Sequence, residues 1–482
     1  MLSFKSYASK IFLLSLALFF SACNKVDVSN RGELVFPDGI SNVVFQEEYY
    51  EDAIDISEPI HNQEWNSSDY KSAEFNQNYA LSGYRVIKNH KTRSSRPCSK
   101  ARGFCKNIND IQYEKNFSVD QNENKKIYFA RPIVIDGRLA VIDKYGVLSV
   151  YKMTNNDNLK LLWEFSLPRH LGEEMIGSYR ASAVAQDGVI VVGLSNGCLV
   201  AINMTTGQEM WRYKMKGQML AVPQIKYGVV YARTESGDIA TFLLSSGSIL
   251  SQANTADSTG DQMASFYTNQ SASFMFGSNG YIYTGTNQGK MEIYTNDNLK
   301  LFDSYSVQDN TGYALFSDIA ITPKLLPNGN VLTGTVYGGM GVFSPDKVDT
   351  VWKKNISLES EVAVMGDYAF FIDKGGNLIA LNYLNGKLKW SQQLKTRIDS
   401  KIAMYLNKGE SNYYYRVYNK GPYVCNNMLL VINSYGEVFG FDINKGTQIA
   451  EAELSDTIRD PVFIGDKIYV LNSSGDKILV IG

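Results

Sequence analysis

Residues 188–211 read GVIVVGLSNGCLVAINMTTGQEMW, and how this stretch folds decides what kind of protein the chain encodes. Its segment 193–197, GLSNG, matches the G-x-S-x-G pattern of serine hydrolases, in which the serine sits between a strand and a helix. Here residues 199–202 form a second short apolar run where that helix should begin. Ser-Asn-Gly between two such runs is typical of a hairpin turn, because Asn and Gly tolerate the positive φ of tight turns. Nothing in the sequence groups one of the three histidines with Ser195 and an acid, so we interpret Ser195 as a turn residue.

The same pattern, a glycine that closes a short turn and is followed by an apolar strand, recurs along the chain. Its copies are 38 to 60 residues apart, at Gly146, Gly197, Gly237, Gly289, Gly338, Gly376, Gly436 and Gly475. In most copies a second turn follows, and then one of four tryptophans (Trp163, Trp211, Trp352, Trp390) or, in its place, Phe302, Ser251 or Ala450. Self-similarity at about 40 residues with short strands is the mark of a β-propeller, whose blades bury their faces against their neighbours.

We therefore predict an all-β fold, an eight-bladed β-propeller of four-stranded blades that spans residues 111–482. The last copy stops after residues 478–481, which leaves its blade one outer strand short. An open blade would expose strand edges. Residues 111–119, just before the first blade, alternate well enough to supply that strand. We expect this N-terminal strand to close the last blade.

Composition agrees with a folded chain and excludes some functions. The 482 residues are 44% hydrophobic and 20% charged, which is not the composition of a disordered or fibrous protein. The net charge is -2, so bulk electrostatics gives no case for binding nucleic acid. The five cysteines and three histidines match no zinc-site spacing, and no catalytic metal is expected.

The first residues read as an export signal. Lys5 and Lys10 precede an apolar core, residues 11–20, that is too short to span a bilayer comfortably. Small residues then precede Cys23, which resembles the end of a bacterial lipoprotein signal, although Phe20 replaces the usual leucine. We expect residues 1–22 to be removed and Cys23 to carry the lipid; an ordinary secretory signal with a chance cysteine is the alternative. In such lipoproteins Asn24 after the cysteine favours the outer membrane, so the predicted location is its periplasmic face.

Residues 23–110 are predicted to be a lipidated tether and an irregular N-terminal segment. A basic tract at residues 85–106 holds eight Lys and Arg and no acid. It is either a contact for phospholipid head groups or an acidic partner, or a solvated loop neutralised by the acidic stretch before it. Within it, Cys98 and Cys105 lie close together in an exported protein, where a disulfide could close. Cys198 and Cys425 fall in or beside repeat strands and are expected to be small core hydrophobes.

Several segments resemble known proteins. The repeats look like pyrroloquinoline-quinone-type (PQQ-like) propeller repeats, and residues 205–211, TTGQEMW, match their closing motif. The whole chain resembles the BamB family, propeller lipoproteins of the bacterial β-barrel assembly machinery, particularly in their alphaproteobacterial form. The similarity rests on residues 131–143, RPIVIDGRLAVID, on 317–323, SDIAITP, and on 366–371, GDYAFF, with 62–65, NQEW, before the ring. The resemblance covers about residues 60–482.

The resemblance implies a function and a partner surface. It implies a non-enzymatic scaffold without a cofactor, which docks on the POTRA domains of BamA and assists the folding and insertion of outer-membrane proteins. In the family an S-D-[IV]-D segment and an L-x-L-R segment one blade earlier form the docking patch. Asp318 matches the first acid, whereas Ala320 replaces the second, and the earlier segment is present as Ser265 followed by Phe266, Tyr267 and Thr268.

Those residues also have a plainer reading. Asp318 would cap a local turn, and the two aromatic side chains would cover the propeller's own face. The functional reading is that aromatic anchors beside a charge, in a linker outside the strand repeat, suit a binding hot spot.

Two other functions remain open, because propellers host many activities. One is a different PQQ-repeat binding lipoprotein of the envelope. The other is a quinoprotein dehydrogenase, which resembles this chain in repeat type but places an adjacent cysteine pair and a tryptophan against the quinone, near acidic Ca²⁺ ligands. No two cysteines are adjacent here, and no acidic cluster has ligand spacing.

Overall fold

A computed structural model describes most of the repeat region. The described residues are 53–58, 117–118, 131–142, 146–153, 159–167, 181–219, 221–254, 273–277, 279–286, 288–307, 319, 321–336, 338–347, 349–394, 419–433, 436–453, 458–464, 467–472 and 477–481. All of them belong to one unit of the chain, residues 39–396 and 417–482; the other unit, residues 1–38 and 397–416, lies outside the described residues.

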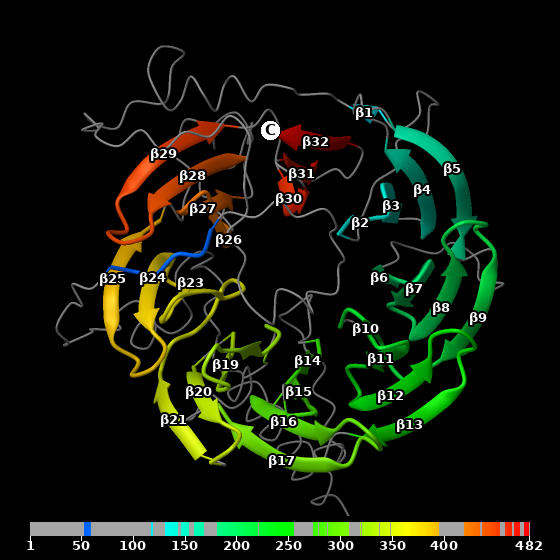
Figure 1. Cartoon of the computed structure of the whole chain (residues 1–482), viewed down its shortest axis with the longest axis horizontal. Helices are drawn as coiled ribbons and strands as arrows, with labels where there is room; N and C mark the ends of the chain where they lie inside the picture. Colours follow the sequence, from blue (N-terminus) through cyan, green and yellow to red (C-terminus); the bar gives the residue numbers. More distant parts are fainter. Residues whose placement is uncertain are drawn as a thin grey trace, which may run out of the picture. The chain divides into compact units, whose positions relative to one another are not determined.

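Within that unit the strands form eight four-stranded antiparallel sheets, here called blades one to eight (Figure 1). Blades one to four contain β2 (Ile133–Ile135), β3 (Arg138–Ile142), β4 (Val147–Met153), β5 (Leu159–Ser166); β6 (Ala181–Gln186), β7 (Val189–Leu194), β8 (Cys198–Asn203), β9 (Glu209–Lys214); β10 (Gln224–Lys226), β11 (Val229–Arg233), β12 (Asp238–Leu243), β13 (Ile249–Asn254); and β14 (Met275–Phe276), β15 (Tyr281–Gly285), β16 (Lys290–Thr295), β17 (Leu301–Ser306). Blades five to eight contain β18 (Lys324–Leu325), β19 (Val331–Gly334), β20 (Met340–Ser344), β21 (Asp349–Lys354); β22 (Ala363–Met365), β23 (Tyr368–Ile372), β24 (Asn377–Asn382), β25 (Leu388–Gln393); β26 (Asn419–Cys425), β27 (Met428–Asn433), β28 (Glu437–Asp442), β29 (Gln448–Glu453); and β30 (Ile458–Ile464), β31 (Lys467–Asn472), β32 (Lys477–Ile481), with β1 (Phe117–Ser118).

The turn that contains Ser195 shows how the sequence builds one blade. β7 ends at Leu194, β8 begins at Cys198, and Gly197 between them has a φ of 87°. The side chain of Asn196 accepts a hydrogen bond from the backbone N–H of Cys198 at 2.9 Å, which fixes the turn. Ser195 is therefore a hairpin residue, as the sequence predicted, and the hydrolase reading is wrong.

The hydrophobic core lies between blades rather than inside any one of them. Residues of blades one and two share one buried cluster, and the pairs two and three, three and four, four and five, five and six, and six and seven each share another. A last cluster joins blades seven, eight and one. Because each blade buries its faces against the next, this unit closes into the ring seen in Figure 1, which confirms the predicted all-β propeller.

Four tryptophans dock the outermost strand of one blade onto the next. The Trp211 indole N–H donates to the carbonyl of Leu244 at 2.7 Å, and its ring packs on Gly247 in the following blade. A Cβ at Gly247 would lie 2.6 Å from that ring, so glycine is required for the contact. The same indole-to-carbonyl bond and glycine contact recur for Trp163 with Met204 and Gly207, Trp352 with Tyr383 and Gly386, and Trp390 with Ile443 and Gly446.

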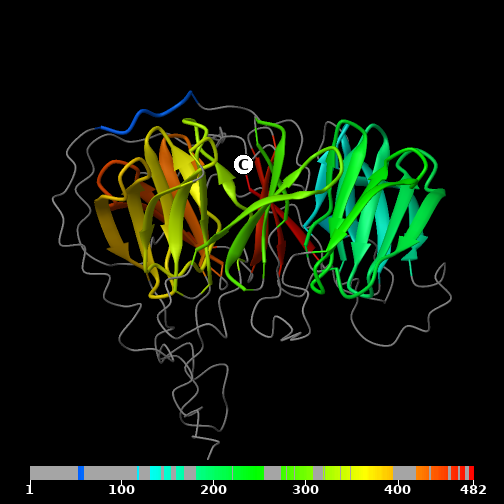
Figure 2. The ribbon, with the colours of Figure 1, turned by 90° about the horizontal axis from the view of Figure 1, so that it is seen from below.

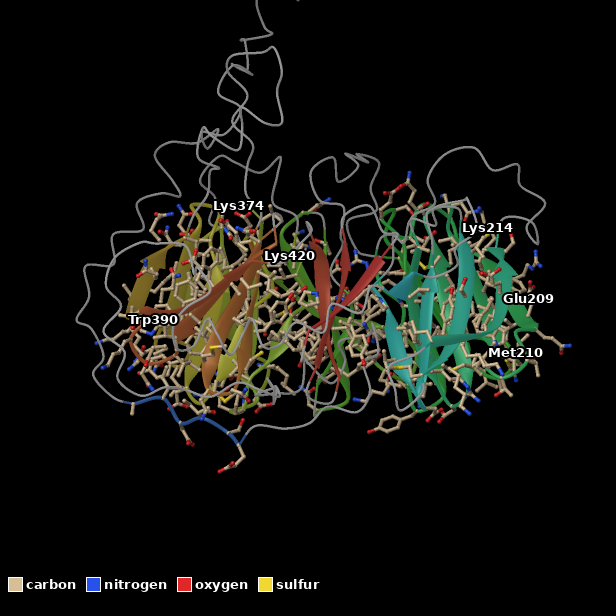
Figure 3. The ribbon with its side chains drawn as sticks, turned by 90° about the horizontal axis from the view of Figure 1, so that it is seen from above. Glu209, Met210, Lys214, Lys374, Trp390 and Lys420 are labelled. Atoms are coloured by element: carbon tan, nitrogen blue, oxygen red, sulfur yellow. The ribbon has the colours of Figure 1, made fainter. Side chains whose placement is uncertain are left out.

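The blades present two different faces. The loop face carries the turns between the second and third strands and the connections from one blade to the next; for example, Met215 N donates to Gly197 O at 2.9 Å. The turn face carries the other two hairpin turns of each blade. Figure 3 shows Lys214 and Lys374 on the loop face, with the blue segment 53–58 on the opposite side.

Chain segments before the first repeat contact the ring at two places. β1 pairs with β32, with Phe117 opposite Ile478 and Ser118 opposite Lys477, so the predicted N-terminal strand supplies the fourth strand of blade eight. Residues 53–58 lie on the turn face over blades six and seven (Figure 2). Among the described residues, no helix is long and apolar enough to cross a membrane.

Candidate partner-binding surface

The residues predicted to bind a partner lie, in the sequence, in the two segments that lead into blades four and five. Phe266, Tyr267 and Thr268 precede β14, and Asp318 precedes β18; all four are outside the described residues, as are Cys23, Cys98 and Cys105. The structure does describe the points where both connections enter their blades, from Ser273 into blade four and from Ile319 and residues 321–323 into blade five. These entrances are the described part of the predicted site.

Ser273 links the entrances of three blades. Its hydroxyl donates to the carbonyl of Val222 at 2.7 Å and accepts a bond from the side-chain amide of Gln224, also at 2.7 Å, both in blade three. Its backbone N–H donates to the Thr322 hydroxyl at 3.2 Å, at the start of blade five. Ser273 and Gln224 are 5% and 2% exposed. Buried hydrogen bonds of this kind fix positions because an unpaired partner is costly.

A buried cation extends this network between blades three and four. Arg233 is 3% exposed, and its guanidinium donates to the Thr284 hydroxyl at 2.8 Å and to the carbonyl of Gly285. Desolvation lowers the pKa of Arg233, and the nearby carboxylate of Glu292 opposes that shift. Glu292 is itself fully buried and accepts a hydrogen bond from the Tyr294 hydroxyl at 2.6 Å. The junction thus holds opposite charges whose removal one at a time would be expensive.

Asp318 is outside the described residues, but the residue that follows it is hydrogen-bonded close to this cation. Ile319, one residue further on, is 2% exposed, and its backbone N–H donates to the carbonyl of Thr286 at 3.1 Å, just past the end of β15. The entrances of blades three, four and five therefore form one hydrogen-bonded platform on the loop face. Sequence reasoning missed this platform. Its one visible signal is the proline beside a polar residue at two entrances, Pro223-Gln224 and Thr322-Pro323.

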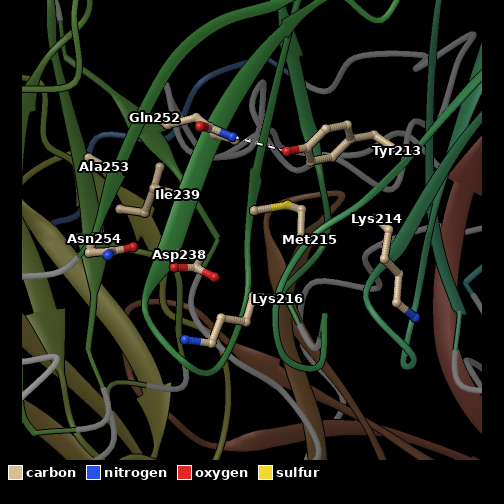
Figure 4. Close-up of a pocket in the computed structure, with 10 residues that line it drawn as sticks. Tyr213, Lys214, Met215, Lys216, Asp238, Ile239, Gln252, Ala253 and Asn254 are labelled. Atoms are coloured by element: carbon tan, nitrogen blue, oxygen red, sulfur yellow. Dashed lines mark hydrogen bonds between the residues drawn. The ribbon is translucent and has the colours of Figure 1, made fainter. Parts of the chain in front are cut away.

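A groove of about 520 Å³ opens between blades two and three, also toward the loop face (Figure 4). Met215, Ile239 and Ala240, all nearly buried, form its apolar part. Lys214 and Lys216 contribute positive charge and Asp238 negative charge, and Gln252 donates to the Tyr213 hydroxyl at 3.1 Å. The lining thus combines apolar side chains with charges of both signs.

Large apolar side chains are exposed along the rim. They lie on the outermost strands of blades one to five: Leu161, Leu162, Met210, Ile249, Leu250, Leu301, Phe302 and Val351, which are 36–52% exposed. Figure 3 labels Met210 beside Glu209 on β9. Six of them form consecutive pairs, at residues 161–162, 249–250 and 301–302, and each pair lies at a β-bulge where the outermost strand shifts register.

Other chemistry-bearing residues have structural roles. Cys198 and Cys425 are buried, as predicted for core residues, and burial raises the pKa of Cys425 well above its ordinary value. Among the described residues, no group of three or more His, Cys, Asp or Glu side chains could hold a metal ion.

Four-stranded blades, with a tryptophan of one blade docked on a glycine turn of the next, define a propeller built from PQQ-like repeats. The model of the family described as outer membrane protein assembly factor BamB matches residues 149–357 and 341–480. Together these matches span more than half of the chain, so the chain belongs to this family.

Individual relatives agree with that assignment. Outer membrane protein assembly factor BamB of Shewanella oneidensis is 22% identical over 306 residues, 62% of this chain and 70% of its own length. The crystal structure of BamB from Moraxella catarrhalis superposes with a TM-score of 0.56 at 16% identity, covering 74% of this chain and 98% of that one. A europium-containing methanol dehydrogenase has a similar fold, with a TM-score of 0.52 at 11% identity, covering 74% of this chain and 85% of that one.

Proposed function

We propose that this protein is a non-enzymatic scaffold lipoprotein of outer-membrane protein assembly, anchored at the periplasmic face of the outer membrane through a lipid on Cys23. The observation that carries the proposal is the family match over residues 149–480. The named function of the relatives, outer membrane protein assembly, supports the same reading. Its partners are then the β-barrel assembly complex, BamA in particular, and unfolded outer-membrane proteins.

We place the docking surface for the POTRA domains of BamA on the connections into blades four and five, centred on Asp318 and including Phe266, Tyr267 and Thr268. The platform supports this choice, because Ser273 and Thr322, which follow these segments in the sequence, are hydrogen-bonded to each other, and Ser273 also to blade three. A loop held at its root loses less entropy when it binds, and preorganisation of this kind strengthens binding.

The test is a double substitution, Asp318→Arg with Tyr267→Ala, measured against purified BamA POTRA domains. We expect affinity to fall more than about thirtyfold, the equivalent of about 2 kcal/mol for loss of a hot-spot anchor. The matched control is Asp297→Arg, the same charge reversal at an exposed residue on the turn face of blade four. Wild-type affinity in the double variant, with unchanged thermal unfolding, would mean that the protein docks through another face.

A different envelope binding function would show in an affinity isolation from gently solubilised membranes. Recovery of BamA with the wild-type protein, and its loss with the double variant, supports the assembly function. Recovery of other envelope proteins or sugars without BamA would favour another PQQ-repeat binding lipoprotein.

The dehydrogenase alternative is favoured by one observation, the fold similarity to a methanol dehydrogenase. It predicts quinone-like absorbance in the purified protein, or Ca²⁺-dependent alcohol oxidation when the quinone is added. We expect neither signal.

A further inference from the structure

The segment 53–58 is seated on the ring by apolar contacts. Ile54 is 5% exposed and belongs to the buried cluster shared by blades six and seven, and Ile56 packs against the same cluster. The members of that cluster include Tyr368 and Phe370 from β23 and Phe441 from β28. Removal of this side chain from water favours the seated position of the segment.

Polar contacts fix the same segment to both blades. The backbone N–H of Ile54 donates to the side-chain oxygen of Asn444, in the last turn of blade seven, at 2.8 Å. On blade six, Gly366 lies beneath Asp55 with a φ of 54°, and a Cβ there would be 2.8 Å from the carbonyl oxygen of Asp55. The turn of blade six is thus shaped to let this backbone approach closely, and we call residues 53–58 the clasp.

We propose that the clasp sets the orientation of the propeller at the membrane, with the turn face toward the bilayer and the loop face turned away from it. The inference rests on the lipid anchor at Cys23 from the proposed function. Twenty-nine residues separate Cys23 from Ala53, and a chain of that length spans at most about 100 Å. Because this chain reaches the ring on the turn face, turning that face away from the bilayer would make the chain pass around the rim, which leaves it fewer conformations.

Two consequences follow for partners. The clasp covers the part of the turn face around Gly366 and Asn444, so this part is unavailable to other proteins while the clasp is seated. The loop face, with the platform of blades three to five, is left open toward the periplasm. With the chain held by the lipid at one end and by the clasp at the other, the platform keeps a roughly constant orientation relative to proteins embedded in the same membrane.

Blade six offers a matched pair of probe positions. Leu384 is 42% exposed in a turn on the turn face, and Lys374 lies in a turn of the same blade on the loop face (Figure 3). A fluorophore would be introduced at each position through an unnatural amino acid, in the lipidated protein bound to phospholipid vesicles that carry a nitroxide quencher on their head groups. We expect quenching at position 384 to be at least twice that at position 374. Equal quenching, or stronger quenching at 374, would overturn the proposal.

Ile54→Asp tests whether the clasp is the cause. It places a charge in the apolar seat, so we expect the difference between the two probes to fall by at least half, while the midpoint of urea unfolding of the ring stays within error. Ala53→Asp adds the same charge at the exposed neighbouring residue and should leave the difference intact. A difference that persists in Ile54→Asp would show that something other than the clasp orients the ring.

A soluble Cys23→Ser protein tests the clasp without any membrane. The Ile54 amide donates to Asn444, so its hydrogen exchange should be at least tenfold slower in the wild-type sequence than in Ile54→Asp. Equal exchange rates would show that the clasp does not form and would overturn the proposal. None of these measurements involves BamA, so their failure is distinguishable from failure of the docking surface.

Discussion

The junction between blades two and three and the junction between blades three and four are filled by equivalent residue pairs. The large side chain of the pair comes from a different blade in each. At the first, Trp211 projects from the outermost strand onto Gly247. At the second, Ser251 takes the tryptophan's place, and Leu299 takes the glycine's, with a φ of 53° and 2% exposure. The Ser251 hydroxyl donates to the carbonyl of Asp297 at 3.3 Å. Asp297 lies in the turn that, at the four tryptophan junctions, accepts the hydrogen bond of an indole N–H. At this junction the bulk has moved from one blade to its neighbour.

The second junction is also the polar one. Arg233 and Glu292 are buried between blades three and four, whereas the cluster shared by blades two and three consists of apolar side chains around Trp211. Hydrophobic docking tolerates small shifts of the packed side chains, while buried polar groups that hydrogen-bond one another permit fewer alternative arrangements. We infer that the tryptophan junctions contribute most to the stability of the ring. The junction between blades three and four instead holds its two blades in a defined relative position.

The largest expected effect is at the apolar junction. Trp211→Ala removes a side chain that is 8% exposed, and we expect it to lower the free energy of unfolding by about 3–5 kcal/mol. Ser251→Ala, at the corresponding place, should cost less than about 1 kcal/mol. Urea unfolding followed by circular dichroism measures both. Similar losses in the two variants would remove the distinction between the junctions.

Arg233→Met tests the polar junction. It leaves the Glu292 carboxylate buried without its cation, which should cost about 3 kcal/mol. Adding Glu292→Gln to Arg233→Met neutralises that charge and should recover part of the loss in the same unfolding experiment. A double variant less stable than Arg233→Met alone would mean that the opposite charges do not compensate one another.

The exchange of bulk can be tested by reversing it. Leu299→Gly relieves a left-handed leucine but empties buried space, and Ser251→Trp alone meets Leu299; each should destabilise by about 2 kcal/mol. In the double variant the tryptophan should fill the space that the leucine leaves, with a favourable coupling of at least about 1 kcal/mol in a double-mutant cycle. Simple additivity would show that the two positions are not equivalent to Trp211 and Gly247.

The smallest effect separates contact from backbone strain. Gly247→Ala and Gly228→Ala both place an alanine at a φ near +72°, which costs about 1 kcal/mol in either case. Only at Gly247 would the new Cβ meet an indole, at 2.6 Å, whereas nothing lies within 4 Å at Gly228. We expect Gly247→Ala to be the more destabilising by about 1–2 kcal/mol in thermal unfolding. Equal losses would mean that the tryptophan shifts without penalty.

Much of the fold could be predicted from the sequence because turns and strands are local. The recurring glycines mark positive φ, and the tryptophans mark the outermost strands. The alternation before the first repeat indicated the strand now seen at Phe117–Ser118. The position of Ser195 in a hairpin turn could be predicted because an apolar run lies on either side of it.

The site was less accessible because its determinants are distant in sequence. Gln224, Ser273 and Thr322 are unremarkable polar residues until the ring brings three blade entrances together. Leu299 stands where other blades have the turn glycine, and the sequence does not show that Ser251 lies opposite it. Ile54 lies within a segment expected to be a tether, and no local pattern shows that its side chain is buried in blades six and seven.

The pairing of β1 with β32 imposes an order in time. Residue 117 is synthesised long before residue 478, its partner in blade eight, so the closing strand must wait while the intervening chain is made. During that interval the nascent ring has two open edges, and each is a template for pairing with another extended chain. A protein proposed to work among unfolded outer-membrane proteins therefore passes through a stage in which it is itself vulnerable to them, until its last strand arrives.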